Sequence, residues 1–174
     1  MKKILITGAG GYIGSVLTRY LLDRGYAVIA FDRFFFGQGT LSQVSGNPML
    51  TIAKKDIRDI EPSDLEGVHA VYDFAALSND PSGDLDPELT VGINHVGRVR
   101  VARAAKRAGV ARYILSSSCS IYGHSDGEPR VAEAGRGGKL ESRSDPEADY
   151  WNQASSIWSG KTALVSRIRS SFKK

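Results

Sequence analysis

Glycine recurs at every third residue in the segment ITGAGGYIG near the amino terminus. An apolar run at residues 3–7 precedes this segment, and a helical pattern over residues 12–24 follows it. Glycine permits tight turns and a close approach of backbone to a ligand, and the free N–H groups at a helix start favour a bound phosphate. In this strand–loop–helix setting the pattern predicts a dinucleotide-binding loop, although a glycine-rich turn without a ligand is the alternative. The glycines are Gly8, Gly10, Gly11 and Gly14.

Further strand-like runs follow at intervals along the chain. Because helix-length segments separate several of them, we expect right-handed crossovers that join the strands into a parallel sheet. The sequence therefore predicts an α/β fold, a doubly wound sheet of five strands in the order 3-2-1-4-5 with helices on both faces. The expected strands are residues 3–7, 26–31, 50–53, 68–74 and 111–117.

Two segments have helical periodicity of their apolar residues. The first, residues 12–24, is expected to end at Gly25, and the second, residues 87–108, at Gly109. Several arginines of the second segment are expected to lie away from its apolar stripe. The positions expected to be buried are Ile13, Leu17, Tyr20 and Leu21 in the first helix, and Val91, His95, Val99, Ala102 and Ala105 in the second.

Asp32 ends the second strand-like run, 18 positions after Gly14. An acidic side chain there accepts hydrogen bonds from the adenosine ribose hydroxyls, which favours NAD over NADP because a 2′-phosphate would meet a carboxylate. Arg33 keeps NADP open, since a nearby arginine can accommodate that phosphate. In the alternative interpretation Asp32 is a strand-end turn residue. The aromatic residues 34–36 either flank a ligand or form a small apolar cluster.

The composition excludes several functional classes. With 174 residues, 41% of them hydrophobic and 24% charged, the chain has the size and composition of one globular domain. A single cysteine, Cys119, excludes an internal disulfide framework and a cysteine-rich zinc site. No metal is expected, because His69, His95 and His124 lack ligand spacing. The apolar runs are too short for a membrane span or a signal peptide, so we expect a reduced, cytoplasmic setting.

The formal net charge of +4 comes from the end of the chain. Residues 161–174 carry five basic and no acidic groups, and the remainder carries 18 basic and 19 acidic groups. A basic tail can contact nucleic acid or an anionic membrane, but a solvated terminus is the favoured interpretation. We therefore expect neither a nucleic-acid nor a membrane partner, since the rest of the chain is nearly neutral and lacks interleaved aromatic and basic residues.

The segment RYILSSSCSIYG, residues 112–123, runs from a strand into a serine cluster and then Tyr-Gly. Together with the glycine loop and Asp32, it resembles the NAD-dependent epimerase/dehydratase branch of the extended short-chain dehydrogenase/reductase superfamily. The resemblance covers residues 1–123. It implies a Rossmann-type NAD-binding domain, an oxidoreductase that acts on a small-molecule nucleotide-sugar, and the homodimer that many members form.

The resemblance also assigns residues to the NAD site. The segment KKDIRD places Asp56 and Ile57 beside the adenine, and the segment DFAALS places residues 75–77 along the cofactor. In the alternative interpretation Asp56 is a loop cap. The implied cofactor-binding residues are Gly8, Gly10, Gly11, Tyr12, Ile13, Gly14, Asp32, Arg33, Asp56, Ile57, Ala75, Ala76, Leu77 and Ser116.

Three residues match catalytic positions of the family. Ser118 matches the serine that hydrogen-bonds the substrate oxygen undergoing oxidation or reduction. Asn94, in VGINHVGRV, matches a helix asparagine that supports active-site geometry, and Tyr150 stands at about the right distance beyond Ser118 for the acid/base tyrosine. In the alternative interpretation the asparagine is a helix-surface amide and the serines satisfy backbone groups at a strand end.

The sequence departs from the family pattern after residue 123. The family's tyrosine has a lysine four residues later that lowers the pKa of the phenol, which is ~10 when unperturbed. None of the seven tyrosines here has that lysine, and Lys161 lies eleven residues after Tyr150. We expect residues 124–174 to be a divergent, disordered tail in place of a catalytic helix and substrate domain, in a truncated member whose sheet is incomplete at its carboxy-terminal side. A frameshift is one hypothesis for this tail, and a non-catalytic dinucleotide-binding fragment or sensor is the alternative function.

Overall fold

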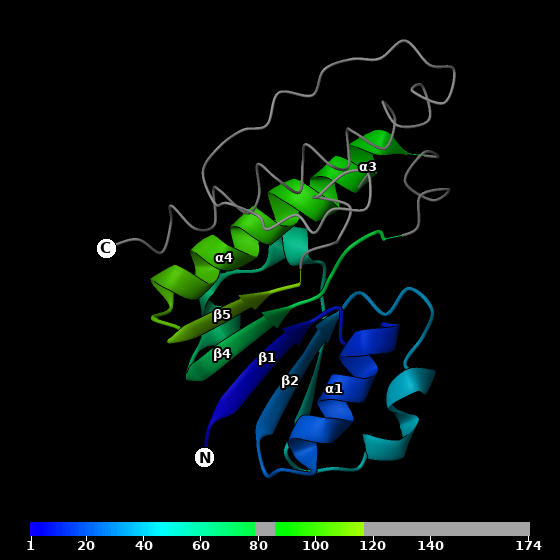
Figure 1. Ribbon diagram of the computed structural model, residues 1–174, viewed down its shortest axis with the longest axis vertical. Helices are drawn as coiled ribbons and strands as arrows, with labels where there is room; N and C mark the ends of the chain where they lie inside the picture. Colours follow the sequence, from blue (N-terminus) through cyan, green and yellow to red (C-terminus); the bar gives the residue numbers. More distant parts are fainter. Residues whose placement is uncertain (79–85, 117–174) are drawn as a thin grey trace, which may run out of the picture.

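The computed structural model describes residues 1–78 and 86–116, which fold around one sheet of five strands (Figure 1). All neighbouring strands are parallel, and their order is β3-β2-β1-β4-β5. The predicted α/β class and the predicted strand order are therefore confirmed. The strands are β1 (Lys3–Thr7), β2 (Ala27–Asp32), β3 (Leu50–Lys54), β4 (Val68–Asp73) and β5 (Arg112–Leu115).

The register of the sheet places the carboxyl ends of its strands along one edge. Thr7, the last residue of β1, pairs with Phe31 on one side and with Asp73 on the other. Asp73 in turn pairs with Leu115, the last residue of β5. The loops that follow β1, β2 and β4 consequently emerge close together and beside the end of β5, as is usual for the ligand edge of a doubly wound sheet.

Helices cover both faces of the sheet, and each face has its own apolar core. Side chains alternate between the faces of a strand, so Leu5 packs on one face with Val101 and Ala105 of α4 (Arg98–Arg107). Ile6 packs on the opposite face with the apolar residues at the end of α1 (Tyr12–Leu22). Figure 1 shows α1 and α4 on opposite sides of the strands.

The buried face of α1 differs from the predicted one. Leu21 is buried as expected, but Ile13 is 59% exposed, Tyr20 is 50% exposed and Leu17 is only half-buried. Small residues face the sheet instead, because the start of α1 lies too close to the backbone after β1 to admit large side chains. The buried residues of α1 are Gly14, Ser15, Thr18, Leu21 and Leu22.

The predicted helix over residues 87–108 has three parts: α3 (Pro87–Val91), a π-helical turn at Gly92–Gly97, and α4. The wider π turn rotates the helix face relative to a uniform 3.6-residue period. Val99 and the two predicted alanines are buried as expected, whereas Val91 is exposed and His95 is only half-buried. Arg100, Arg103 and Arg107 are exposed, as expected of several arginines, whereas Arg98 is buried.

Short 3-10 turns complete the described part, at Gly39–Val44, Ile57–Asp59 and Pro62–Leu65. Gly25 and Gly109 follow α1 and α4 with positive φ angles of 76° and 72°, as expected for helix-ending glycines. Among residues 1–78 and 86–116, no helix is long and apolar enough to cross a membrane.

Candidate functional site

The carboxyl edge of the sheet brings together the predicted site residues that the structure describes. The glycine loop follows β1, Asp32 ends β2, residues 75–77 follow β4, and Ser116 follows β5. Asp56 lies just after β3, and Asn94 lies in the π turn. Segments that are far apart in the sequence therefore meet at one edge.

Two glycines of the loop occupy positions that no other residue could take without displacement. Gly8 has a φ angle of 70°, and a Cβ atom there would lie 2.8 Å from the backbone nitrogen of Ala75. A Cβ on Gly14 would lie 2.1 Å from the carbonyl oxygen of Gly8. The loop therefore packs backbone to backbone against both α1 and the segment after β4.

The first turn of α1 presents amide groups without a side-chain partner at its cap. Gly11 is the N-cap residue and makes no side-chain capping hydrogen bond, and the first turn contains no acidic residue. The side chains of Tyr12 and Ile13 are 89% and 59% exposed. N–H groups at a helix start together with its positive dipole end favour an anion such as a pyrophosphate.

Asp32 fixes the glycine loop to the end of β2. Its Oδ2 accepts a hydrogen bond from the Gly10 N–H at 2.9 Å, and its Oδ1 accepts one from the Phe34 N–H at 2.6 Å. The second bond is that of a turn residue, as in the alternative interpretation. An ionised carboxylate offers about four acceptor positions, so ribose hydroxyls can still bind to Asp32.

The aromatic residues 34–36 differ in burial. Phe34 is buried in the core beside α1, and a Cβ on Gly10 would lie 2.9 Å from its ring. Its positive φ angle of 52° is the only one among the described non-glycine residues. Phe35 and Phe36 are exposed. The apolar-cluster interpretation therefore describes Phe34 alone.

Asp56 lies in a small cluster of charges. The Arg58 guanidinium donates to both carboxylate oxygens of Asp56, at 3.0 and 2.8 Å, and Arg33 lies 3.6 Å away. The hydrogen bond from the Arg58 side chain is the main cause that lowers the pKa of Asp56. Asp56 also accepts from the Arg58 N–H and caps the turn, as in the alternative interpretation. The neighbouring Ile57 side chain is buried against Gly97, so only its backbone can reach a ligand.

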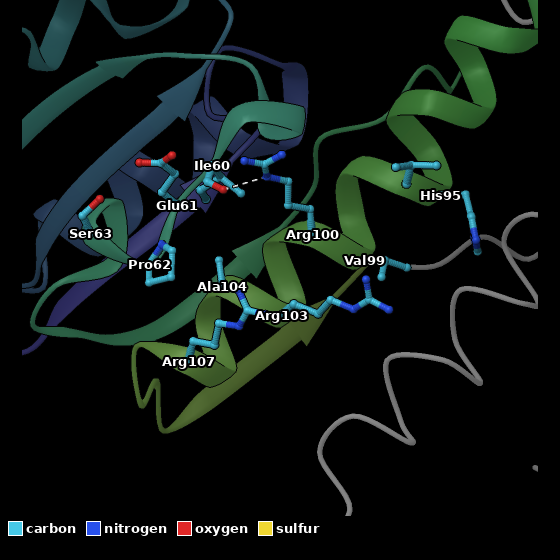
Figure 2. Close-up of a pocket in the computed structure, with 11 residues that line it drawn as sticks. Ile60, Glu61, Pro62, Ser63, His95, Val99, Arg100, Arg103, Ala104 and Arg107 are labelled. Atoms are coloured by element: carbon cyan, nitrogen blue, oxygen red, sulfur yellow. Dashed lines mark hydrogen bonds between the residues drawn. The ribbon is translucent and has the colours of Figure 1, made fainter.

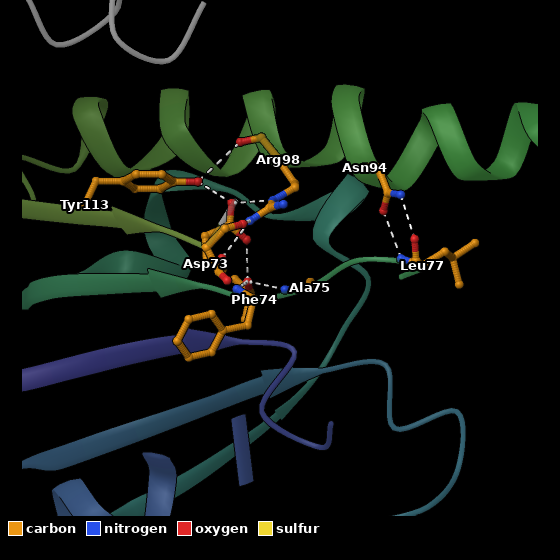
Figure 3. Close-up of polar contacts among 9 residues, drawn as sticks. Asp73, Phe74, Ala75, Leu77, Asn94, Arg98 and Tyr113 are labelled. Carbon is orange, nitrogen blue, oxygen red and sulfur yellow. Dashed lines mark hydrogen bonds and ion pairs between the residues drawn. The ribbon is translucent and has the colours of Figure 1, made fainter. Parts of the chain in front are cut away.

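Asn94 holds the segment after β4 by two hydrogen bonds (Figure 3). Its Oδ1 accepts from the Leu77 N–H and its Nδ2 donates to the Leu77 carbonyl, both at 2.8 Å. Asn94 is buried, so its alternative interpretation as a helix-surface amide is wrong. The backbone of Leu77 is thus fixed to the π turn.

The sequence analysis missed a buried polar network next to this segment (Figure 3). The Asp73 carboxylate accepts hydrogen bonds from the Thr7 hydroxyl at 2.6 Å, from Arg98 at 3.2 Å, and from the Tyr113 hydroxyl. Thr7 in turn accepts from the N–H groups of Phe74 and Ala75. The sequence signal for this network was Asp73, an acidic residue at the end of a buried strand, because a buried charge requires partners.

The network has one negative member, one positive member and two neutral hydroxyls. Asp73 is fully buried and Arg98 is 3% exposed, so their charges compensate each other away from water. Burial is the main cause that raises the pKa of Tyr113 well above its ordinary range, and the charge of Asp73 adds to it. Tyr113 therefore stays protonated and donates to the carboxylate.

Two predicted catalytic residues, Ser118 and Tyr150, lie outside the described residues, as do Cys119 and His124. Ser116 is described, and its carbonyl accepts a hydrogen bond from Arg98 at 2.8 Å. In the part of the chain that the structure describes, no group of three or more His, Cys, Asp or Glu residues could hold a metal ion.

A groove of about 740 Å³ lies away from the ligand edge, between the turn at Pro62–Leu65 and the outer face of α4 (Figure 2). Arg100, Arg103 and Arg107 line it, and Arg100 donates to the Ile60 carbonyl at 3.0 Å. None of the predicted site residues contributes to this groove.

Comparisons with known proteins agree with this geometry. The model of the NAD dependent epimerase/dehydratase family matches residues 4–145. The chain is 32% identical over 133 residues to UDP-glucuronic acid decarboxylase 1 of Xenopus tropicalis, a match that covers 76% of this chain and 31% of that protein. It is 34% identical over 129 residues to UDP-glucose 4-epimerase of Mycolicibacterium smegmatis, with 70% and 40% covered. The chain thus spans less than half the length of these two curated relatives.

Solved structures show the same relationship. A dTDP-glucose 4,6-dehydratase from Streptomyces venezuelae, solved with NAD bound, superposes with a TM-score of 0.68 at 30% identity, over 72% of this chain and 42% of that one. A UDP-glucuronic acid 4-epimerase from Bacillus cereus, in complex with UDP-glucuronic acid and NAD, superposes with a TM-score of 0.67 at 28% identity, over 75% and 44%.

Proposed function

The chain belongs to the NAD-dependent epimerase/dehydratase family, and we propose that it acts in an NAD-dependent oxidoreductase that modifies a nucleotide-sugar. The glycine loop is the observation that carries this proposal. A Cβ atom at Gly8 or Gly14 would overlap the chain's own backbone, so the tight turn between β1 and α1 requires glycine at both positions. The names of the relatives support the substrate class, since they are UDP-sugar and dTDP-sugar enzymes. In this proposal residues 1–123 form the NAD-binding domain.

The described residues fit NAD. The pyrophosphate binds at the uncapped start of α1, where N–H groups point away from the helix. Asp32 binds the adenosine ribose, and the backbone beside Asp56 and Ile57 borders the adenine. Ala75, Ala76 and Leu77 border the other half of the cofactor. The small side chains of Ala75 and Ala76 fit a close approach of this segment to a ligand.

The charges at the ends of β2 and β3 favour NAD over NADP. Asp32 carries a negative charge where a 2′-phosphate would lie. Arg33, the residue that could pair with that phosphate, lies 3.6 Å from Asp56. The exposed guanidinium of Arg33 therefore already has an anionic partner.

When bound, NAD takes up or returns a hydride at the sugar carbon that reacts. The chain's own residues then have two tasks, which are to bind the substrate oxygen and to move its proton. We assign the first to Ser118 and the second to Tyr150, both on the basis of the family resemblance alone. Asn94 acts indirectly, because it holds the Leu77 backbone beside the cofactor.

A second candidate function is a dinucleotide-binding module without catalysis. The absence of a lysine four residues after any tyrosine favours it, since a phenol without that neighbour keeps a high pKa. Candidate nucleotide-sugars incubated with NAD and the purified chain distinguish the two functions. Sustained product formation would exclude the non-catalytic module, and NAD binding without turnover would exclude catalysis by this chain.

Calorimetric titration with NAD and NADP tests the cofactor part of the proposal. We expect the wild type to prefer NAD, and Asp32→Ala to lose about tenfold to a hundredfold in NAD affinity, since bonds to a charged acceptor contribute about 1.5–3 kcal/mol. Asp23→Ala is the matched control, because it removes an exposed carboxylate at the other end of α1. Equal affinity of the wild type for both cofactors would contradict the role of Asp32.

A further inference from the structure

We propose that Arg98 is a positioning residue for the nicotinamide half of the cofactor. Its guanidinium joins the carboxyl ends of β4 and β5 and thereby sets the place of Ser116 and of residues 73–77, which leave β4. This inference rests on the proposed function, because it assumes that NAD binds at this edge of the sheet.

Three hydrogen bonds connect Arg98 to the strand ends (Figure 3). Its Nη2 donates to the Asp73 carbonyl at 2.7 Å and to the Ser116 carbonyl at 2.8 Å, and its Nε donates to the Asp73 carboxylate at 3.2 Å. Asp73 is the last residue of β4, and Ser116 directly follows β5. One guanidinium thus contacts the backbone at the carboxyl ends of both strands.

Stability alone does not account for an arginine at this position. Burying an ion pair removes two charges from water, and an apolar replacement of both partners is often as stable. The planar fork of a guanidinium can donate to several acceptors in fixed directions, which an apolar side chain or a lysine cannot do. Joining two backbone carbonyls is therefore the specific contribution of Arg98.

The helical segment that contains Arg98 also fixes the far end of residues 73–77, the segment that leaves β4. Asn94, four residues before Arg98, binds both backbone groups of Leu77. Between these two fixed points lie Phe74 and Ala75, whose N–H groups donate to the Thr7 hydroxyl. Residues 73–77 are consequently fixed at their start, middle and end.

This stretch lies on the nicotinamide side of the proposed site. A doubly wound sheet binds a dinucleotide across the point where the strand order reverses, here between β1 and β4. The adenosine ribose lies at Asp32, on the β2 side of β1. The nicotinamide half therefore lies on the β4 side, where Arg98 fixes the backbone.

ADP has the adenosine half of NAD without its nicotinamide half, so a comparison of the affinities for ADP and NAD distinguishes the two halves of the site. We expect Arg98→Lys and Arg98→Met to lose about tenfold or more in NAD affinity while ADP affinity stays within about twofold of the wild type. Arg103→Met is the matched control, since it makes the same change at an exposed arginine of the same helix. The control variant should leave both affinities within about twofold. Circular dichroism and urea unfolding establish that each variant is folded.

The outcomes distinguish this inference from the proposed function. A wild type that binds neither NAD nor ADP contradicts the proposed function. A wild type that binds both, with Arg98 variants that lose both equally or lose neither, overturns the role of Arg98 and leaves the proposed function intact. Failure of both Arg98 variants to fold also overturns it, because Arg98 would then serve the stability of the sheet.

Discussion

The two sides of β1 build the proposed site by different means. On the β2 side, the site consists of glycine backbone, an uncapped helix start and one carboxylate. On the β4 side, buried polar side chains hold the backbone in place: Thr7, Asp73, Asn94, Arg98 and Tyr113. The first side depends on the absence of side chains, and the second depends on the mutual compensation of charges and hydrogen bonds.

This difference determines how each side responds to substitution. A side chain added at Gly8 or Gly14 meets backbone, which cannot move aside as a side chain does. A residue removed from the polar side leaves a buried charge or hydrogen-bonding group without its partner. Substitutions on the β2 side should therefore destabilise the protein by steric overlap. Substitutions on the β4 side should destabilise it by leaving buried charges or hydrogen-bonding groups without partners.

Gly14→Ala should have the largest effect. The added Cβ would lie 2.1 Å from the Gly8 carbonyl oxygen, so α1 or the loop must shift, and we expect a loss of more than about 4 kcal/mol in the free energy of unfolding. Urea unfolding measures this loss. Gly39→Ala is the control, because a Cβ there meets nothing within 4 Å. Equal stability of the two variants would show that the loop is not packed this tightly.

Asp73→Asn tests the polar side. The substitution leaves the buried Arg98 charge uncompensated, and removing one partner of a buried pair costs about 3–5 kcal/mol. Lys55→Met, which breaks the partly exposed pair with Asp64, should cost no more than about 1 kcal/mol. Both values come from chemical denaturation at neutral pH. If the two variants were destabilised to the same extent, the buried network would have no special role.

Thr7→Val tests the link between the two sides, since Thr7 ends the central strand. The change removes the hydroxyl that accepts from the Ala75 N–H, whereas the Phe74 N–H keeps the Thr7 carbonyl as an acceptor, so we expect a loss of about 1–3 kcal/mol. Thr51→Val on the exposed face of β3 is the matched control and should be nearly neutral. Hydrogen exchange should also accelerate at residue 75. Unchanged exchange there would argue against this acceptor role.

Arg58→Met should have the smallest effect, and its size should depend on pH. The pKa of Asp56 is lowered in the folded state, so the pair stabilises the protein above the unfolded carboxyl pKa of about 3.9 and this stabilisation is lost as the pH falls further. Because the Arg58 side chain is more than a third exposed, we expect at most about 1 kcal/mol at pH 7.

The matched control for this pH dependence is Arg103→Met, which removes an exposed arginine of α4. Thermal unfolding between pH 3 and pH 7 should show the stability difference between Arg58→Met and the wild type shrinking toward acid. A difference that is constant over this range would mean that the carboxylate of Asp56 gains nothing from Arg58.

The candidate site was predictable where its signal is local. The glycines and Asp32 stand within 25 residues of one another, and the contact between Gly10 and Asp32 joins two consecutive strand ends. Asn94 was predicted by family resemblance, but its two bonds to Leu77 were not, because they connect a helix to a loop 17 residues earlier. Ser118 and Tyr150 stay predictions.

The network around Asp73 illustrates what a local pattern cannot indicate. Its members are separated by 66 residues from Thr7 to Asp73, by 25 from Asp73 to Arg98, and by 40 from Asp73 to Tyr113. Several arginines of the long helix were predicted to lie away from its apolar stripe, but Arg98 stands three residues after His95 and four before Ala102, on the stripe itself. The structure buries it there against Asp73.

By itself, the sequence determined the class of fold, the order of the strands and the glycine loop, because alternating apolar runs and glycine spacing act through nearby residues. Only the tertiary structure decided which side of α1 is buried, where the long helix is interrupted, and which partner compensates the charge of Asp73. Those outcomes depend on the approach of distant segments, at Gly14 against Gly8 and at Gly97 against Ile57, where atomic contact leaves room for one arrangement.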